Sequence, residues 1–194
     1  WPEESHTQEA VCKAVHDGFI EPILVCSKQT MEDYAKKNAF QCIIAESPED
    51  AARKAVELIR RGEADIVMKG FLNTDVLLRA ILDKEVGILP KDTVLTHITV
   101  AKLPEYPKLL FFTDAAVIPA PNDKQRRAQV QYIVDFCHAF EIECPKIALI
   151  HCSEKVDERH FPYTASYRAL KAESETGAFG KCTIDGPLDL ITSC

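Results

Sequence analysis

Short apolar segments alternate with helical patterns along the first half of this chain, and this alternation limits the fold more than any other feature. Residues 22–26, 40–45 and 65–68 are predicted as buried strands. The residues between them keep the apolar spacing of helices. Parallel strands need a crossover, usually a helix, so the alternation predicts an α/β fold with a parallel sheet covered on both faces. The predicted helices cover residues 5–17, 31–37, 47–62 and 74–82.

The helix predicted over residues 47–62 has the clearest boundary signals. Ser47 suits the N-cap and Pro48 the first helical position, and carboxylates follow in the first turn. Gly62 suits the left-handed position just beyond the last turn. These signals fix both ends of this helix from the sequence.

The second half follows a different pattern, which places a domain boundary near residue 90. Residues 93–101 alternate as a strand, and residues 108–112 form an apolar strand. We therefore expect a first α/β domain over 1–92 and a second, incomplete α/β domain over 93–194. The remaining predicted elements are helices over 122–140 and 163–175 and strands over 146–150 and 182–184.

The charge of the chain limits its partners. Lys and Arg total 23 and Asp and Glu total 30, so the net charge is −7. This balance disfavours a broad nucleic-acid footprint, although it leaves room for a small basic pocket that binds phosphate groups. No apolar run approaches the ~20 residues that span a bilayer. We expect no nucleic-acid and no membrane partner.

The cysteines indicate free thiols rather than a disulfide framework. They are irregularly spaced, several lie inside apolar patterns, and no CxxC pair indicates a zinc ribbon or a thioredoxin-like site. We expect no metal site, and a reducing, cytoplasmic location. His151 and Cys152 are neighbours, but adjacent residues on a strand point to opposite faces, so we expect no catalytic dyad between them. The eight cysteines are Cys12, Cys26, Cys42, Cys137, Cys144, Cys152, Cys182 and Cys194.

A polar cluster after the third predicted strand has the chemistry of an anion site. Gly70 lets the backbone approach a ligand, and Lys69 supplies positive charge. Asn73 or Thr74 caps the next helix, whose N-terminus carries partial positive charge, and Arg79 follows on that helix. The alternative is a solvated lysine followed by an ordinary cap. The GxxxxGK[ST] spacing of a P-loop is absent.

Two further polar pairs follow strands of the second half. Thr113 and Asp114 offer a hydroxyl and a carboxylate to a ligand, but an aspartate at this position also closes a strand turn. Ser153 and Glu154 offer the same groups, with a helix cap and a first-turn carboxylate as the alternative. Ligands bind at the carboxyl ends of strands in open α/β sheets, which makes a binding role possible for both pairs, although the residues by themselves favour the structural alternative.

Other polar residues have a structural interpretation. His97 lies on an alternating strand and is interpreted as a structural histidine rather than a base. Arg126 and Arg127 lie on a helix with polar neighbours, which indicates a solvated face, with the lining of a cleft as the alternative. No GxGxxG, HExxH or GxSxG motif is present, so a standard dinucleotide site, a zinc protease and an α/β-hydrolase are unsupported.

Seven short motifs occur in a fixed order along almost the whole chain. Together they resemble the phosphate acetyl/butyryltransferase family. The Lys69-Gly70 pair after the third strand makes the sequence more similar to the phosphate butyryltransferase branch. The motifs are GEADIVMKG over 62–70, Thr74 with LLRA over 77–80, EVGI over 85–88, FTDAA over 112–116 with Pro119, PKIAL over 145–149, SEKV over 153–156 and DGPL over 185–188.

The resemblance implies a two-domain, parallel-sheet sandwich of the isocitrate/isopropylmalate dehydrogenase-like type. It implies an enzyme that transfers an acyl group from acyl-CoA to inorganic phosphate, with the active site in the interdomain cleft. Coenzyme A thioester and phosphate are then substrates, no cofactor is tightly bound, and the protein is a homo-oligomer. By position, Arg79 matches a family arginine that holds phosphate or the phosphate groups of CoA. The other substrate-binding residues implied are Lys69, Gly70, Asn73, Thr74, Thr113, Asp114, Ser153 and Glu154.

The sequence departs from the family near its end. The family carries a serine-arginine pair and a carboxylate close to its C-terminus, and nothing here matches them. The sequence stops shortly after Gly186-Pro187, and Thr192-Ser193 is not followed by arginine. We therefore assign no catalytic residue and expect the C-terminal part of the fold to be missing. The alternatives are an inactive remnant or subunit that binds CoA or a phosphorylated ligand, and a metal-dependent dehydrogenase of the same architecture.

Overall fold

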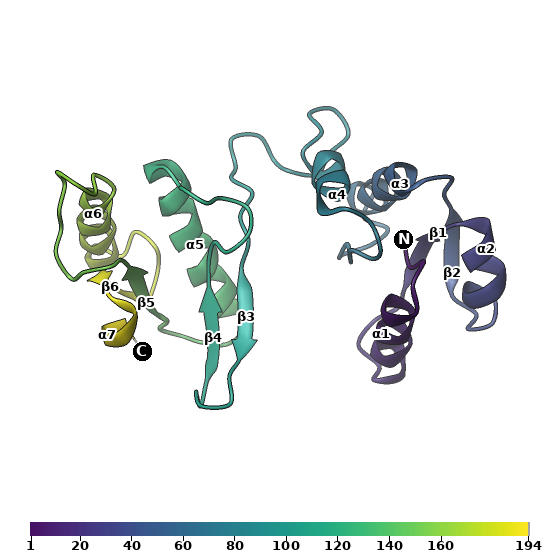
Figure 1. The fold of residues 1–194 in the computed structure, drawn as a ribbon, viewed down its shortest axis with the longest axis horizontal. Coiled ribbons are helices and arrows are strands. Elements are labelled where there is room, and N and C mark those ends of the chain that lie inside the picture. The colour runs from purple at the N-terminus through teal and green to yellow at the C-terminus, as the bar shows by residue number, and fades with distance from the viewer. Residues whose placement is uncertain (194) are drawn as a thin grey trace. The chain divides into compact units, whose positions relative to one another are not determined.

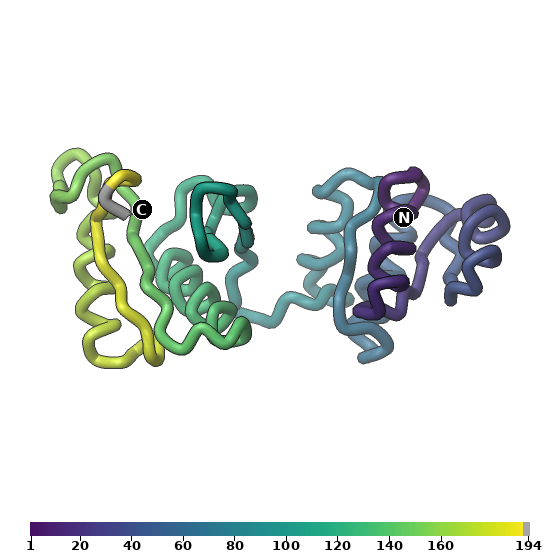
Figure 2. The backbone as a smooth tube through the Cα atoms, turned by 90° about the horizontal axis from the view of Figure 1, so that it is seen from below, coloured from purple at the N-terminus to yellow at the C-terminus, as the bar shows by residue number. Residues whose placement is uncertain are grey.

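The computed structural model describes the backbone of residues 1–193 and the side chains up to residue 191. The chain divides into two compact units, Trp1–Lys91 and the residues from Asp92 onward. Figure 1 labels the helices and strands, and the backbone of each unit can be followed in Figure 2. No helix of the described residues is long and apolar enough to span a bilayer. Cys194 lies outside the described residues.

The first unit is built on one pair of parallel strands. Strands β1 (Ile23–Cys26) and β2 (Gln41–Ile44) align from Ile23 opposite Gln41 to Cys26 opposite Ile44. Successive side chains of β1 point to opposite faces, and each face has its own apolar core. The helical elements are α1 (Ser5–His16), α2 (Lys28–Thr30), the π-helical turn η1 (Met31–Ala35), α3 (Pro48–Arg60) and α4 (Thr74–Ile81).

The two cores of this unit explain why β1 and β2 are buried. Leu24 and Cys26 pack against α1 and η1 on one face. Val25 packs with Ala51 and Leu58 of α3 on the other face. Helices therefore cover both faces of this strand pair, as the alternation of strands and helices predicts.

The third predicted strand is absent. Residues 65–68 are irregular backbone that pairs with neither β1 nor β2, and Ile66 and Met68 are 83% and 57% exposed. A strand exists only where a neighbour supplies a hydrogen-bonded ladder, and the apolar pattern of four residues does not reveal whether one does. A little further on, the amide of Phe71 donates to the carbonyl oxygen of Trp1 at 2.8 Å.

The second unit contains a hairpin and a second pair of parallel strands. Strands β3 (Thr99–Lys102) and β4 (Leu109–Phe112) are antiparallel. Strands β5 (Lys146–Ile150) and β6 (Thr183–Leu188) are parallel, with an irregularity between Ala148 and Ile150. The helices are α5 (Asp123–Ala139), α6 (Thr164–Glu175) and α7 (Leu190–Ser193).

Both long helices of this unit pack on the β5–β6 pair. Its core joins side chains of α5, α6, β5 and β6 around the fully buried Phe179. The predicted strand over 93–101 starts only at Thr99, the last strand extends to Leu188, and α7 was not predicted. The core residues are Val130, Val134, Leu149, Tyr167, Leu170, Phe179 and Ile184.

The expected isocitrate/isopropylmalate dehydrogenase-like parallel-sheet sandwich is wrong. The described residues form three separate two-stranded sheets, and one of them is antiparallel. The parallel sheets stay small because residues 65–68 add no strand to the first pair and the hairpin β3–β4 runs antiparallel. What remains of the expectation is an α/β protein with small parallel sheets.

One glycine of β6 is required by close packing. A Cβ atom at Gly186 would lie 2.6 Å from Leu149 Cβ and 2.7 Å from the Leu149 carbonyl oxygen, and the glycine has φ +145°. Residues with side chains rarely adopt this conformation. Gly186 therefore allows β6 to approach β5.

Two peptide bonds of the second unit are cis, Gly186-Pro187 and Thr113-Asp114.

Candidate functional site

The first unit has a cavity of about 590 Å³ that is lined by α3 and α4 and the residues next to α4. The lining residues of α3 recur three, four and eleven positions apart, so they share one helical face. Apolar groups such as Val56, Val76 and Val86 line it together with charged groups. The charged and amide lining residues are Glu49, Arg53, Glu57, Arg60, Asn73, Asp75, Arg79 and Asp83.

Three arginines line this cavity, and they differ in how much they are already neutralised. Arg53 lies 2.6 Å from the Asp50 carboxylate, whose pKa is held down to about 2 by hydrogen bonds from Lys54 and Arg53. Arg79 is 84% exposed and lies 3.5 Å from Asp75. Among the described residues Arg60 has no ion-pair partner, so Arg60 and Arg79 are the guanidinium groups best placed to bind an added anion.

The predicted Lys69–Thr74 cluster is divided by the structure. Asn73 lines the cavity with Arg79, whereas Lys69, Gly70 and Thr74 are not among its lining residues. Lys69 is exposed, and its Nζ donates to the Gly70 carbonyl oxygen at 3.3 Å. Asn73 precedes α4 but its side chain makes no capping hydrogen bond.

Glycine is required at position 70 because the backbone there lies against another part of the same unit. A Cβ atom there would lie 2.4 Å from the Trp1 carbonyl oxygen, so the backbone of Gly70 closely approaches protein backbone. The prediction that Gly70 makes room for a ligand therefore has a competing structural explanation in this fold.

In the second unit, Thr113 and Asp114 belong to one hydrogen-bonded cluster. Asp114 Oδ2 accepts from Thr96 Oγ1 at 2.7 Å and from the His97 amide at 3.0 Å. Its Oδ1 accepts from the amides of the next turn, at 2.8 Å from Ala116 and 2.7 Å from Val117. The Thr113 and Thr96 hydroxyls are 3.2 Å apart.

These contacts fix the charge state of Asp114. Burial alone would raise the pKa of its carboxyl group, but the hydrogen bonds from Val117, Ala116, Thr96 and His97 outweigh burial and hold the pKa well below its usual range. Asp114 is thus an anion whose oxygens are occupied by protein donors. This geometry suits a residue that positions the Thr113 hydroxyl, and it does not suit a proton acceptor.

Ser153 and Glu154 follow β5, as predicted. Ser153 is half-buried and Glu154 is exposed. Within the described part of the chain, neither side chain makes a hydrogen bond or ion pair, and none joins them to Asp114. Both groups are therefore available to a ligand.

His97, which is interpreted from the sequence as a structural histidine, has its ring nitrogen Nδ1 3.3 Å from Thr99 Oγ1.

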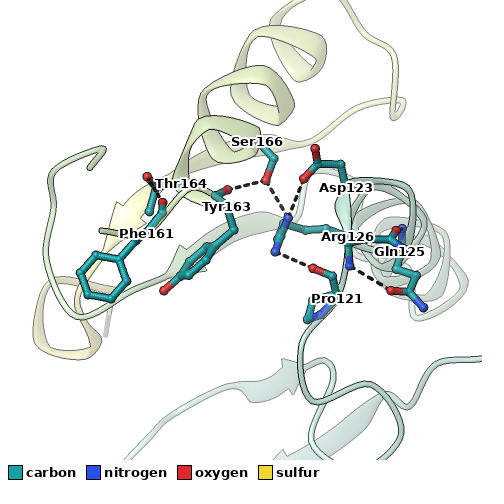
Figure 3. Close-up of polar contacts among 9 residues, drawn as sticks. Pro121, Asp123, Gln125, Arg126, Phe161, Tyr163, Thr164 and Ser166 are labelled. Atoms are coloured by element: carbon teal, nitrogen blue, oxygen red, sulfur yellow. Dashed lines mark hydrogen bonds and ion pairs between the residues drawn. The ribbon is translucent and has the colours of Figure 1, made fainter. Parts of the chain in front are cut away.

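Arg126 is buried, which the interpretation as a solvated face missed. It is 8% exposed, and its guanidinium donates to Ser166 Oγ at 2.8 Å and to the Pro121 carbonyl oxygen at 2.8 Å (Figure 3). It also lies 3.1 Å from Asp123 and 5.5 Å from the ring centres of Tyr163 and Tyr167. The signal in the sequence is its helical spacing to the apolar residues of α5 that follow it.

The predicted separation of His151 and Cys152 is also wrong. Strand β5 ends at Ile150, so the opposite-face rule for strand neighbours does not apply to these residues. Cys152 Sγ lies 3.6 Å from His151 Nε2, and Tyr163 Oη lies 2.9 Å from His151 Nδ1.

The part of the chain that is described contains no group of three or more His, Cys, Asp and Glu residues able to hold a metal ion.

The helix-covered parallel strand pairs define an α/β protein, and its candidate site is a cavity that three arginines line together with four carboxylates. The family model described as "Phosphate acetyl/butaryl transferase" matches residues 26–190, and this chain belongs to that family. The predicted resemblance is confirmed.

Individual relatives agree with this assignment. The phosphate butyryltransferase of Clostridium acetobutylicum is 37% identical over 187 residues, which are 94% of this chain and 62% of the relative. The phosphate acetyltransferase of Thermotoga maritima is 28% identical over 191 residues, 96% of this chain and 64% of the relative. The chain thus spans less than two thirds of the length of these relatives.

Solved structures match the fold. A branched-chain phosphotransacylase from Enterococcus faecalis V583 has a TM-score of 0.78 at 24% identity, over 96% of this chain and 66% of that one. A phosphotransacetylase from Staphylococcus aureus has a TM-score of 0.65 at 15% identity, over 94% and 65%. Both solved structures are phosphotransacylases. Their fold therefore replaces the expected isocitrate/isopropylmalate dehydrogenase-like fold.

Proposed function

We propose that this chain acts as a phosphate acyltransferase, in the reaction acyl-CoA + phosphate ⇌ acyl phosphate + CoA. The observation that carries the proposal is the family match over residues 26–190. Relatives named phosphate butyryltransferase and phosphate acetyltransferase support the same class of reaction. Two domains are proposed, over 1–92 and 93–194, and the division into compact units after Lys91 supports a boundary in this region.

The reaction needs anion binding more than it needs a nucleophilic side chain. A phosphate oxygen attacks the thioester carbonyl carbon, the C–S bond breaks, and the CoA sulfur leaves with the electron pair and takes up a proton. Both substrates carry phosphate groups, and guanidinium groups bind phosphate through paired, charge-assisted hydrogen bonds. Arg60 and Arg79 are proposed to bind these groups, with the Asn73 amide beside them.

The remaining predicted site residues are proposed as supporting contacts. Lys69 and Gly70 before α4 and Thr74 at its start do not line the cavity and are proposed as additional ligand contacts. In the second unit, the Thr113 hydroxyl is proposed to contact substrate, and Asp114 positions it through Thr96. Ser153 and Glu154 are proposed as ligand contacts because no protein group among the described residues bonds to their side chains. The residues that activate the reaction are not assigned.

The family supports further proposals about the whole protein. Its ligands are small molecules, a CoA thioester and inorganic phosphate, and no tightly bound cofactor is needed for direct attack by phosphate. A cytoplasmic location and a homo-oligomer are proposed on the same ground. Nucleic acid is disfavoured as a partner by the net charge of −7.

The test is an assay of CoA release from butyryl-CoA and other short acyl-CoAs, followed with a thiol reagent and combined with calorimetric titration of CoA. Phosphate-dependent release supports the proposal. Binding of CoA without release would replace it by a ligand-binding role, and absence of both would overturn it.

A variant pair tests the cavity. Arg79→Ala removes a charge-assisted contact, so the apparent KM for phosphate or for acyl-CoA is expected to rise about tenfold or more. Arg168→Ala is the control, because Arg168 is exposed, pairs with Glu158, and neither residue lines the cavity. Equal KM values for Arg79→Ala and the unmodified chain would remove Arg79 from the site.

A further inference from the structure

We propose that Cys152, His151 and Tyr163 form a nucleophilic thiol site in the second unit, which is modified by small uncharged carbon electrophiles of the α-haloamide kind. The proposal goes beyond acyl transfer and does not rest on it. It predicts that Cys152 reacts faster than another exposed thiol of the same chain.

The geometry places a base beside the sulfur and a partner behind the base. His151 Nε2 lies 3.6 Å from Cys152 Sγ, and His151 Nδ1 lies 2.9 Å from Tyr163 Oη. A nucleophile next to a base that a third group orients is the usual arrangement for activating a thiol. The contacts bring together two residues after β5 and one residue before α6.

The imidazole is held in place from several sides. His151 is 7% exposed, and its amide donates to the Leu188 carbonyl oxygen at 2.8 Å. The rings of Phe161 and Tyr163 meet it edge-on, with ring centres 4.7 Å and 5.5 Å away. A fixed imidazole loses little freedom when it accepts the thiol proton, which favours transfer.

Tyr163 is fixed in turn by its neighbours on α5 and α6. The Arg126 guanidinium lies 5.5 Å from its ring centre, and Ser166 Oγ donates to its carbonyl oxygen at 2.6 Å. Figure 3 shows Tyr163 next to Arg126 and Ser166, with Phe161 beside it. The Tyr163 backbone and ring thus both have contacts within the protein, and its hydroxyl lies against His151.

The step is balanced without an added oxidant or reductant. The thiol proton passes to His151 Nε2, and the protonated ring donates its Nδ1–H to Tyr163 Oη. The thiolate sulfur attacks the carbon of iodoacetamide, the S–C bond forms, the C–I bond breaks and iodide leaves. His151 then releases the proton to solvent.

The chain supplies its own reference thiol. Cys144 and Cys152 are both exposed, so both are open to a small reagent. Only Cys152 of these two has a histidine nitrogen within hydrogen-bond distance, among the residues described. The ratio of the two alkylation rates therefore measures activation and cancels differences in reagent concentration.

The experiment alkylates the folded chain with limiting iodoacetamide at neutral pH, quenches at short times and quantifies each modified cysteine by peptide mass spectrometry. Cys152 is expected to react about tenfold faster than Cys144. Tyr163→Phe keeps the ring and removes the hydroxyl, and His151→Gln removes the base, so both are expected to lower the ratio severalfold. Tyr167→Phe is the control, because that hydroxyl donates to the Ile150 carbonyl oxygen and does not contact His151.

Each outcome decides the proposal. Equal rates for Cys152 and Cys144 in the unmodified chain would overturn it, whatever the variants do. A high ratio that Tyr163→Phe leaves unchanged would overturn the three-residue arrangement, and circular dichroism checks that this variant is folded. The assay measures alkylation rather than acyl transfer, so its failure leaves the proposed reaction untouched.

Discussion

At the scale of single residues, Asp114 combines a fixed negative charge with a full set of donors. Its carboxylate oxygens accept hydrogen bonds from the Thr96 hydroxyl and the His97 amide, which precede β3. They also accept from two backbone amides of the turn that follows Asp114. A carboxylate held in this way joins residues far apart in the sequence. Its contribution to stability therefore depends on its ionisation.

Replacing this carboxylate is expected to destabilise the second unit. Asp114→Asn removes acceptor capacity and charge, so the free energy of unfolding at pH 7 is expected to fall by about 2 kcal/mol. The folded-state pKa of Asp114 lies below its ordinary value of 3.8, so its contribution is complete above that pH and is lost as the pH falls through the folded pKa. Urea unfolding at several pH values should show the difference between unmodified and variant chains shrinking below pH 3.8.

The control for this prediction is an aspartate on the surface. Asp135 is exposed and accepts one hydrogen bond from the Gln131 side chain. Asp135→Asn is expected to change stability by less than about 0.5 kcal/mol. Similar losses for both variants would contradict the role given to the Asp114 donors.

Gly186 is a second residue whose identity is set by space. Gly186→Ala would place a Cβ atom 2.7 Å from the Leu149 carbonyl oxygen, so β5 and β6 would have to separate. A loss of about 3 kcal/mol of unfolding free energy is expected. Gly177→Ala is the matched control, because Gly177 has φ +79° but nothing within 4 Å of the added Cβ. If both variants lose the same stability, backbone conformation rather than close packing explains the requirement.

At the scale of elements, the sequence predicts best what is decided locally. Helix α3 begins at Pro48 with Ser47 accepting from the Asp50 amide, as its cap signals predict. Whether residues 65–68 become a strand depends on a partner strand elsewhere in the chain, which no local pattern contains. In the same way, the end of β5 at Ile150 decides that His151 and Cys152 can meet.

The candidate site divides in the same way between local and distant causes. The position of Asn73 and Arg79 at α4 follows from helix spacing, so these residues could be predicted. The α3 arginines that join them were not, because sharing a cavity depends on how α3 packs against α4. The donors to Asp114 from before β3 are likewise brought to it by the hairpin.

Arg126 connects α5 to α6, and its loss is expected to weaken that contact. Arg126→Met keeps most of the volume but removes hydrogen bonds to Ser166 and Pro121 and two ring contacts. A loss of about 2–3 kcal/mol is expected in urea unfolding. Arg168→Met is the control: Arg168 is exposed and pairs with Glu158 at 3.6 Å, so its loss should cost less than about 1 kcal/mol. Equal losses for the two variants would contradict the role given to the Arg126 contacts between α5 and α6.

At the scale of the whole molecule, the two units carry separate apolar cores. The cores around β1 lie within the first unit, and the core around Phe179 lies within the second. Each unit also holds a buried thiol: Cys26 in β1 and Cys137 in α5. Burial is the main cause that raises the pKa of Cys26 to about 11, and burial also raises the pKa of Cys137. Both thiols are therefore protected from alkylation until their own surroundings open.

These two thiols can report on the units one at a time. In a urea series with brief iodoacetamide labelling, Gly186→Ala is expected to shift the labelling midpoint of Cys137 to lower urea and to leave that of Cys26 in place. The reason is that Gly186 packs on Leu149, whose core lies wholly within the second unit. Gly177→Ala, on the same unit, should move the Cys137 midpoint much less. Equal shifts at Cys26 and Cys137 would mean that both units unfold in one cooperative transition, because a local change in β6 would then be felt in β1.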